Sequence, residues 1–399
     1  MNNMEKRNIP EIRFKGFVGD WKEDKLGNIS NISKMAGFEF TEHVNYSDEG
    51  SIVAIRGLNV KEGKLNLNDV KYIDDSNLDK LERSKLFKGD IIFTYTGTVG
   101  ETAIIPENNK FYLAPNVARI RLNQNENPLF YINNISRTEY FNKVIRRYIT
   151  ESSQATLNME NIRKLEIMKT NLQEQKEIGR LFESLDQTID LQGKVVEENK
   201  RLKQALLQKL FPKKGQKFPE LRLKGFSGDW EEKKLSEIDN IEIYQPKTIT
   251  ANDFINDGKY KVFGANGYIG SYDKYNHETD QVTISCRGEN SGLVNYVKAF
   301  TWITGNSMVV NIDKCKELNK YFFYNLLSCK NLKRIVTGSG QPQITRKDLV
   351  TFKIEVPSIP EQEAIGNLFR SLDEKILREE ERLEGYKTLK KSLLQKMFV

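Results

Sequence analysis

The stretch PEIRFKGFVGDWKEDKLGNI at residues 10–29 decides how this chain is organised, because it returns as PELRLKGFSGDWEEKKLSEI at residues 219–238. Thirteen of the twenty aligned positions are identical, and Trp21 and Trp230 are one of the matching pairs. Unrelated segments of this length would agree at about one or two positions. The chain is therefore an internal duplication with an offset of 219 − 10 = 209 residues, and we refer to this segment as the opening motif.

A second repeat closes each half of the chain. Residues 174–189 (EQKEIGRLFESLDQTI) match residues 361–376 (EQEAIGNLFRSLDEKI) at ten of sixteen positions, and LLQKLF at 206–211 matches LLQKMF at 393–398. Both pairs have an offset of 187, so the first half carries 209 − 187 = 22 additional residues between its shared segments. Shared ends around divergent middles are what a duplicated scaffold with two different specificities would look like.

The closing repeats predict two long amphipathic helices, at 173–211 and 361–399. Apolar residues recur at spacings of three, four and seven opposite a charged face, as in a coiled coil. These positions are Ile178, Phe182, Leu185, Ile189, Val196, Leu206 and Leu210 in the first copy, and Ile365, Phe369, Leu372, Ile376, Leu383, Leu393 and Met397 in the second. The seams are interrupted by Asn199, Lys203, Glu379 and Lys390. We expect the helices to pack on each other; burial of each in an ordinary globular core is the alternative.

The short connection between the halves predicts that the two helices are antiparallel. Only the segment from Pro212 to Pro219 separates the first helix from the second opening motif, so the second globular region begins at the far end of that helix. The second helix starts after Pro357 and Pro360, beside this region, and reaches the first helix only by running back. We therefore expect two similar domains related by a pseudo-twofold axis, with the chain ends close together.

The divergent middles are typical of mixed α/β (α+β) domains, with short β-rich runs separated by Gly and Asn turns. These runs include 52–55, 91–95 and 117–122 in the first half, and 260–263, 281–286 and 308–312 in the second. GDIIFTYTGTVG at 89–100 and TDQVTISCRGENSG at 279–292 look like corresponding strand-and-turn units. The predicted organisation is a globular domain at 1–172, a helix at 173–211, a second globular domain at 212–357 and a helical segment at 358–399.

The net charge of +7 lies outside the two predicted helices. The first helix carries seven basic and seven acidic residues and the second carries eight of each, so both are neutral. The globular regions and linkers hold the excess positive charge, which is the distribution expected if they contact an anion and the helices act as a spacer.

Two basic clusters beside aromatic residues make this expectation more specific. One surrounds Lys143 to Tyr148 and precedes SSQATLN at 152–158; the other ends at Arg334 and precedes TGSGQPQITRKD at 337–348. Long cations bind phosphate oxygens, while Gln, Asn, Ser and Arg read base edges. Solvated basic faces followed by ordinary loops are the alternative. The residues favoured for DNA contact are Lys143, Arg146, Arg147, Gln154, Asn158, Arg287, Lys330, Lys333, Arg334, Gln341, Gln343 and Arg346.

The sequence lacks the motifs of the familiar catalytic and metal-binding classes. None of its GK pairs is followed by Ser or Thr in a nucleotide-binding loop, and its ten prolines include no adjacent pair of the kind an amino-methyltransferase motif requires. Three widely spaced cysteines and two histidines signal neither a disulfide framework nor a metal site. No membrane-spanning stretch or signal peptide is recognised, so we expect a cytoplasmic protein. No catalytic residue is predicted.

The two opening motifs and the EQ…IG.LF.SLD…LLQK(L/M)F helices closely resemble the specificity (S) subunits of type I restriction–modification systems. The resemblance covers essentially the whole chain. It implies two target-recognition domains, at 1–172 and 212–357, which alternate with two conserved antiparallel helices. Each domain would read one half of a bipartite target in double-stranded DNA, and the helices would fix the spacing between the halves.

The resemblance also implies partners and places the chemistry on them. Two modification subunits would bind S-adenosylmethionine and methylate adenine, and two restriction subunits would use ATP, with Mg²⁺, to translocate and cleave DNA. This chain itself would bind no cofactor and catalyse nothing. The candidates for scaffold packing and subunit docking are then Trp21, Trp230, Phe182, Phe369, Leu206 and Leu393.

Two other functions compete with this interpretation. A stand-alone DNA-binding regulator would bind its target tightly without modification subunits, and an autonomous nuclease would cleave DNA with Mg²⁺ alone. The sequence gives neither the bases of the target nor the length of the gap between its halves.

Overall fold

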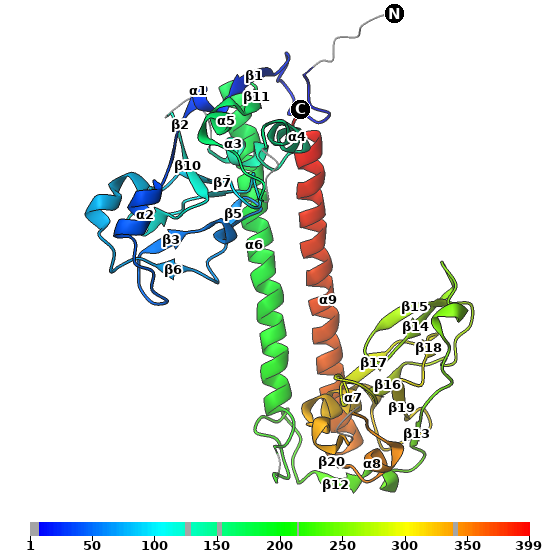
Figure 1. The fold of residues 1–399 in the computed structure, drawn as a ribbon. Helices are drawn as coiled ribbons and strands as arrows, with labels where there is room; N and C mark the ends of the chain where they lie inside the picture. Colours follow the sequence, from blue (N-terminus) through cyan, green and yellow to red (C-terminus); the bar gives the residue numbers. More distant parts are fainter. Residues whose placement is uncertain (1–7, 124–128, 150–153, 214, 338–341) are drawn as a thin grey trace, which may run out of the picture. The chain divides into compact units, whose positions relative to one another are not determined.

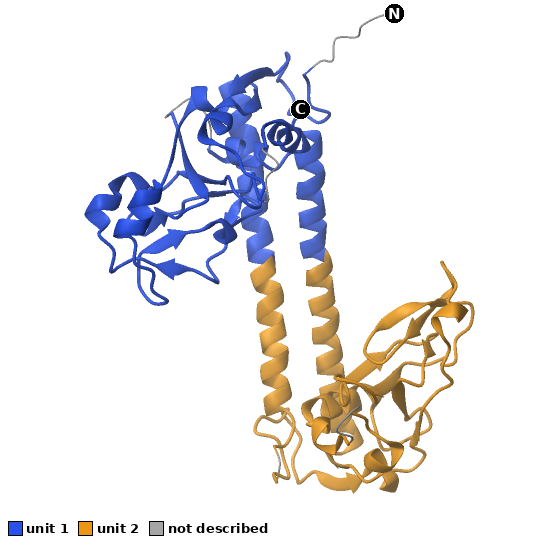
Figure 2. Cartoon of the chain, viewed as in Figure 1, with its two compact units in different colours: residues 1–192, 382–399 blue, residues 193–381 orange. Residues whose placement is uncertain are grey.

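The computed structural model describes residues 8–123, 129–149, 154–213, 215–337 and 342–399 (Figure 1). The chain forms two compact units (Figure 2). Unit 1 comprises residues 1–192 together with 382–399, and unit 2 comprises residues 193–381. The division falls within both long helices, so each unit contains one globular region and a part of each helix.

The two predicted long helices are present, and each has 38 residues. Helix α6 runs from Leu172 to Lys209 and helix α9 from Ile359 to Lys396, within three residues of the predicted ends. Asn171 precedes α6, and its side-chain oxygen accepts a hydrogen bond of 2.9 Å from the backbone N–H of Glu174. Such a cap satisfies one of the N–H groups that the first turn of a helix leaves without a partner.

In each unit the parts of α6 and α9 pack antiparallel. In unit 1, Asp186 of α6 pairs with Lys390 of α9, while Phe182, one turn earlier, contacts Phe398, beyond the end of α9. In unit 2, Lys200 lies 2.8 Å from Glu380 and Lys203 lies 2.6 Å from Asp373. Residue numbers rise along one helix as they fall along its neighbour, which confirms the predicted direction.

The globular region of unit 1 is built on two small sheets. The first is antiparallel in the order β2-β10-β7-β8, and in the second β3 pairs antiparallel with β6 and parallel with β9. A ribbon of β1 and β11 joins the opening motif to the segment before α6, and β4 pairs with β5. The strands are β1 Lys22–Lys25, β2 Ser30–Lys34, β3 Val53–Ile55, β4 Val60–Lys61, β5 Lys64–Leu65, β6 Lys71–Tyr72, β7 Ile91–Thr94, β8 Thr102–Ile104, β9 Phe111–Leu113, β10 Val117–Leu122 and β11 Glu166–Lys169. The helices before α6 are α1 Leu26–Ile29, α2 Gly37–His43, α3 Leu129–Ile135, α4 Glu139–Tyr148 and α5 Met159–Lys164.

Unit 2 repeats this topology. Its antiparallel sheet has the order β13-β19-β16-β17, its second sheet has β14 antiparallel to β15 and parallel to β18, and β12 pairs with β20. The strands are β12 Glu231–Lys234, β13 Glu242–Tyr244, β14 Tyr260–Phe263, β15 Tyr268–Tyr272, β16 Gln281–Ser285, β17 Val294–Val297, β18 Trp302–Ile303, β19 Ser307–Asn311 and β20 Lys353–Val356. The helices before α9 are α7 Lys320–Cys329 and α8 Arg346–Val350.

The duplication therefore extends through the middles, where the sequence similarity has faded. Strands β7 and β16 hold the same place in the two sheets, which confirms the predicted match between residues 89–100 and 279–292. The mixed α/β class is confirmed as well.

Most of the 22 additional residues of the first half fall in two connections. Residues 56–70 join β3 to β6, whereas residues 264–267 join β14 to β15, a difference of 15 − 4 = 11 residues. Residues 73–90 join β6 to β7, whereas 273–280 join β15 to β16, a difference of 18 − 8 = 10. The first connection includes the β4–β5 hairpin.

A matching aromatic cluster anchors each unit to its helices. In unit 1 the ring of Phe398 contacts Trp21, Tyr131 and Phe182, with centroids 5.5 to 6.1 Å apart. In unit 2 Phe211 takes the place of Phe398, since 211 + 187 = 398, and contacts Trp230, Phe322 and Phe369 at 5.6 to 6.2 Å. The six predicted scaffold residues all belong to these two cores: Trp21, Phe182 and Leu393 in unit 1, and Trp230, Phe369 and Leu206 in unit 2.

Candidate nucleic-acid interface

In both units the chain makes the same backbone contacts where the central strand of the larger sheet ends. In unit 1, Tyr95 N–H donates to Asn116 C=O at 3.1 Å, and its own C=O accepts from Leu157 N–H at 2.8 Å. In unit 2, Cys286 makes the same two bonds, with Asn306 and with Ile344, both at 3.1 Å. The residue after the strand is thus held between two loops that are distant in sequence.

The next residues of these segments differ between the units. Thr96 forms a β-bridge with Thr156 in unit 1, and Arg287 forms the equivalent bridge with Gln343 in unit 2. The chain then enters α5 and α8, which Asn158 and Thr345 cap by accepting backbone N–H groups. Identical backbone geometry therefore presents a pair of small hydroxyl side chains in one unit and an Arg–Gln pair in the other.

A concavity of about 480 Å³ lies at this place in unit 2. It brings together three residues that were predicted from sequence for DNA contact, Arg287, Gln343 and Arg346. Arg346 donates from Nε to the C=O of Ile243 at 2.9 Å, which fixes the direction of its guanidinium. Gln245, which the sequence analysis missed, lines the same concavity.

A concavity of about 500 Å³ lies beside the equivalent strand end in unit 1 and includes Thr96, the counterpart of Arg287. Its polar lining includes Arg56, Thr96, Thr98 and Asn116, and none of these was predicted as a site residue. The guanidinium of Arg56 pairs with Asp69 at 2.9 Å. The match of residues 89–100 to the segment that contains Arg287 is the sequence signal that could have identified Thr96 and Thr98.

A partly buried hydrogen bond supports the wall of the unit 2 concavity. The hydroxyl of Tyr244 lies 3.0 Å from Nε2 of His277, and Asn276 Oδ1 lies 2.6 Å from Nδ1. Burial lowers the pKa of His277 to about 4 and raises the pKa of Tyr244, so both side chains are neutral at pH 7. The positive charge of this surface therefore comes from its arginines.

The basic residues predicted on α4 lie on the surface of unit 1. Lys143 pairs with Glu139 at 2.8 Å, and Arg147 pairs with Glu166 at 3.1 Å, with about three fifths of each basic side chain exposed. Arg146 is exposed in the last turn of α4, and Gln154 and Asn158 are exposed after it. The Lys143–Glu139 and Arg147–Glu166 pairs lie at the surface, where an ion pair contributes about 0–1 kcal/mol to stability. An incoming phosphate can therefore replace the carboxylate.

The second predicted basic cluster is less uniform. Lys330 is 13% exposed and its ammonium pairs with Glu355 of β20, so its charge is already neutralised. Lys333 is exposed, and the exposed Arg334 lies over the ring of Phe352 at 5.3 Å. Gln341 lies outside the described residues. Lys333 and Arg334 are therefore the cations of this cluster that face solvent.

Two observations concern other kinds of site. Within the described ranges, no three His, Cys, Asp or Glu side chains lie together as a metal ion would need. In the same residues no helix has the length and apolar character to cross a membrane.

Several known proteins that are similar to this chain are named as specificity subunits. The chain is 24% identical over 414 residues to a putative type I restriction enzyme MjaX specificity subunit of Methanocaldococcus jannaschii, covering 98% of this chain and 95% of the relative. The type I restriction enzyme EcoBI specificity subunit of Escherichia coli is 28% identical over 171 residues, covering 42% of this chain and 35% of the relative. The crystal structure of a type I restriction–modification S subunit from M. genitalium has the same fold, with a TM-score of 0.69 at 19% identity over 98% of this chain and 99% of that one.

The family comparison covers both halves of the duplication. The profile of the type I restriction modification DNA specificity domain matches residues 19–201 and again residues 227–385. These matches include both globular regions and most of both long helices, so they agree with the repeats and with the repeated topology. The chain belongs to the family of type I restriction–modification DNA specificity subunits, and it carries two target-recognition domains.

Proposed function

We propose that this chain directs a type I restriction–modification complex to a bipartite DNA target, and that each unit reads one half of it. The observation that carries the proposal is the repeated backbone frame, which presents Thr96 and Thr156 in one unit and Arg287 and Gln343 in the other, with a concavity beside it in each unit. A repeated frame with different polar side chains is what two different half-sites require.

The side chains at these places have the chemistry for reading DNA. Arg makes bidentate hydrogen bonds with guanine, Gln with adenine, and Thr contacts either a base edge or a thymine methyl group. The cations on α4 and after α7 would hold phosphates, which positions the domain without selecting a sequence. Each wrong base pair costs ~1–3 kcal/mol, so two linked readings give a specificity that one small domain lacks.

The modification subunits would dock on the helices. Single exposed apolar side chains are common on soluble proteins, whereas apolar side chains that recur along a helix can form a surface that a partner covers. Large apolar residues with 38% to 62% exposure recur along the two helices at Leu191, Val195, Leu202, Leu377 and Leu389. We infer that two modification subunits cover such positions, and that two restriction subunits join them in the complete complex.

The chemistry would then come from the partners. Adenine methylation would use S-adenosylmethionine bound by the modification subunits, and cleavage would use ATP and Mg²⁺ bound by the restriction subunits. This chain would bind no cofactor and would act as the non-catalytic specificity subunit.

A genome-wide map of methylated adenines tests the proposal. Deletion of the gene should remove one bipartite motif from the map, and the lost motif spells out both half-sites and the gap. The double variant R287A/Q343A should alter one half-site and leave the other unchanged. The matched variant T96A/T156A should alter only the second half-site. An unchanged map after deletion in a host with active modification subunits would contradict the proposal, as would DNA cleavage by the purified chain with Mg²⁺ alone.

A further inference from the structure

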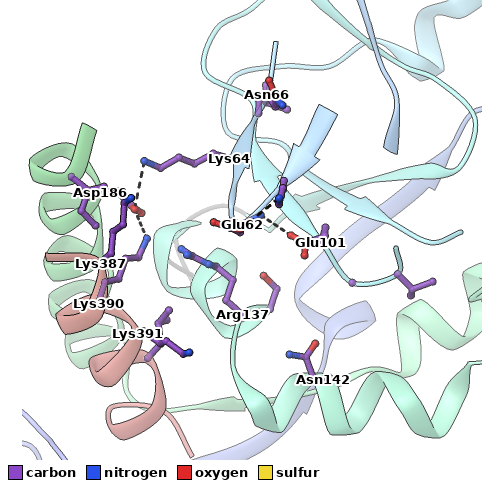
Figure 3. Close-up of a pocket in the computed structure, with 17 residues that line it drawn as sticks. Glu62, Lys64, Asn66, Glu101, Arg137, Asn142, Asp186, Lys387, Lys390 and Lys391 are labelled. Atoms are coloured by element: carbon purple, nitrogen blue, oxygen red, sulfur yellow. Dashed lines mark hydrogen bonds and ion pairs between the residues drawn. The ribbon is translucent and has the colours of Figure 1, made fainter. Parts of the chain in front are cut away.

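Unit 1 contains a cavity of about 650 Å³ between its globular region and its helices (Figure 3). The β4–β5 hairpin forms one wall, the segment after α3 forms another, and α6 and α9 form the third. Its volume lies within the range of about 300–1,000 Å³ that is usual for small-molecule sites. The concavities described above lie elsewhere and share no lining residue with it.

The lining of this cavity carries an excess of positive charge. Three carboxylates, Glu62, Glu101 and Asp186, line the cavity with six basic side chains. Two of these lysines are paired with carboxylates just outside the lining, Lys64 with Asp190 and Lys387 with Glu384, both at 2.6 Å, so the balance is 6 − 5 = +1. Two of the carboxylates are already engaged, because Glu101 accepts from the backbone N–H of Glu62 at 2.6 Å and Asp186 pairs with Lys390. The basic residues are Lys61, Lys64, Arg137, Lys387, Lys390 and Lys391.

Arg137 lies in the middle of this arrangement (Figure 3). No carboxylate among the described residues lies within 4.0 Å of its guanidinium, which reaches only Asn134 Oδ1, at 3.5 Å. Burial lowers its pKa, which shows that its positive charge is poorly solvated. Half-buried guanidinium groups normally pair directly with a carboxylate or phosphate; Glu62, Glu101 and Asp186 act on Arg137 only through space.

The duplication supplies an internal comparison for this cavity. Asp186 and Lys390 of unit 1 correspond to Asp373 and Lys203 of unit 2, at the offset of 187 in each case. In unit 2 the surroundings of this ion pair are aromatic, since Tyr321 donates to Asp373 at 2.6 Å and Lys203 lies over the ring of Tyr324. The ion pair alone therefore belongs to the common scaffold, whereas the basic lining is particular to unit 1.

The wall formed by the hairpin is also particular to unit 1. It belongs to the 11 additional residues between β3 and β6, a connection that is only four residues long in unit 2. Glu62 and Gly63 both have positive φ, as a two-residue hairpin turn requires. A Cβ on Gly63 would lie 3.2 Å from the side chain of Arg137, so the turn is closely fitted to that arginine. The added segment thus confines the unpaired guanidinium inside a cavity.

We propose that this cavity binds a small anion with several phosphate charges, of the size of pyrophosphate or a nucleotide, and that Arg137, Lys390 and Lys391 bind it. Among the described residues Arg137 and Lys391 have no carboxylate partner, and Lys390 shares Asp186 with Lys64, so these three cations can bind separate phosphate oxygens of one anion. Burial and the neighbouring Arg137 lower the pKa of Lys390 to about 8, and a bound anion would relieve both effects. The site shares no lining residue with the DNA-reading concavities.

Binding of pyrophosphate and of ATP to the purified full-length chain tests the proposal. Calorimetry should give one saturable site in unit 1, measured against sodium chloride at matched ionic strength. The variants Arg137→Gln and Lys391→Gln should each weaken the affinity by about tenfold, while Arg137→Lys, which keeps the charge, should lose less. Lys80→Gln, an exposed charge change in the same unit and outside the cavity, is the control and should bind normally.

Each outcome decides for or against the site. Loss of binding in the two cavity variants, with unchanged circular dichroism, supports it, and the exposed Lys391 carries the test if Arg137→Gln does not fold. Absence of pyrophosphate and ATP binding at millimolar concentration overturns it, and so does equal binding by both variants and the wild type. The backbone of DNA is the other possible source of phosphate groups. If the cavity variants weaken binding of a DNA duplex, and pyrophosphate neither binds nor competes, then the cavity contacts DNA and the proposal is wrong.

Discussion

Arg13 of the opening motif and Glu174 of the first turn of α6 form a two-pronged ion pair, with nitrogen–oxygen distances of 2.6 and 2.7 Å, across 161 residues of sequence. The carboxylate of Glu174 is fully buried and also accepts the hydroxyl of Thr170. Arg13 donates further to the carbonyl groups of Gly19 and Val18, so it holds the motif in its turn. Arg222 and Glu361 repeat the arrangement in unit 2, where 222 − 13 = 209 and 361 − 174 = 187. The pair explains why both repeats persist in sequence: each supplies half of one contact.

Arg13→Met should destabilise unit 1 by about 3–5 kcal/mol, because it leaves the buried carboxylate of Glu174 without its partner. Urea unfolding followed by circular dichroism measures this change. The double variant Arg13→Met/Glu174→Leu should recover much of the loss, since it removes the uncompensated charge. Arg222→Met is the matched change in unit 2. A loss below about 0.5 kcal/mol for both single variants would contradict the role of the pair.

Lys333→Ala/Arg334→Ala should weaken DNA binding to all sequences alike and flatten its salt dependence. Each lost phosphate contact lowers the slope of log K against log salt by about 0.9. The measurement is a titration of the specific complex and of a non-specific duplex at several salt concentrations. Lys330→Ala is the comparison, because this lysine is paired with Glu355 and should change the slope less. An unchanged slope in the double variant would remove this cluster from the interface.

Insertion of one heptad into α6 alone should abolish target-specific methylation. The two paired positions of α6 are 203 − 186 = 17 residues apart, and those of α9 are 390 − 373 = 17 residues apart. A heptad added between Asp186 and Lys203 makes these spacings 24 and 17, so the two ion pairs no longer form together. Inserting a heptad into both helices restores the match and should give activity on a target with a different gap. Retention of the original target by the single insertion would show that the helices do not set the spacing.

His277 should remain neutral well below the pH at which an exposed histidine is protonated. Its pKa in the folded chain is about 4 because it is buried, while the unfolded chain takes up the proton near 6.5. The depressed pKa therefore contributes stability that is present above pH 6.5 and is lost as pH falls toward 4, by roughly 3 kcal/mol at the lower limit.

Proton NMR of the ring resonances measures this titration directly, since the chain has only two histidines and His43→Gln identifies the second signal. A midpoint near 6.5 for His277 would contradict its burial beside Tyr244. The free energy of unfolding of unit 2 should fall over the same pH window.

The features predicted correctly from sequence are those that both halves share. Trp21 and Trp230, or Phe182 and Phe369, meet the same packing requirements in both cores, so the repeats that contain them kept their sequence and were visible. The long helices followed from apolar periodicity, and their direction followed from a short connection. These are local properties of the chain.

The candidate site was predicted only in part, because its residues meet through contacts between distant segments. Thr96 reaches Thr156, and Arg287 reaches Gln343, through β-bridges that no local pattern announces. Lys330 is a residue type that commonly binds phosphate, and it lies in a basic cluster of the sequence. Its ammonium group is nevertheless paired with Glu355 of β20, which lies 25 residues further along the chain. Arg56 and Gln245 follow strands that are not equivalent in the two units, and each enters the site only through the three-dimensional lining of its own concavity.

The placement of Phe398 in the core of unit 1 has a consequence for synthesis on the ribosome. Unit 2 is one continuous stretch, residues 193–381, whereas unit 1 needs residues 382–399 to complete its aromatic cluster. Domains commonly fold in the order in which they emerge. Here we expect the reverse order. The globular region of unit 1 is synthesised first but keeps an incomplete core until the C-terminal residues emerge, so unit 2 completes its core before unit 1 does. A nascent chain stalled before residue 382 would therefore expose Trp21, Tyr131 and Phe182. Packing of the C-terminal end of α9 is then the last step in forming the native core of unit 1.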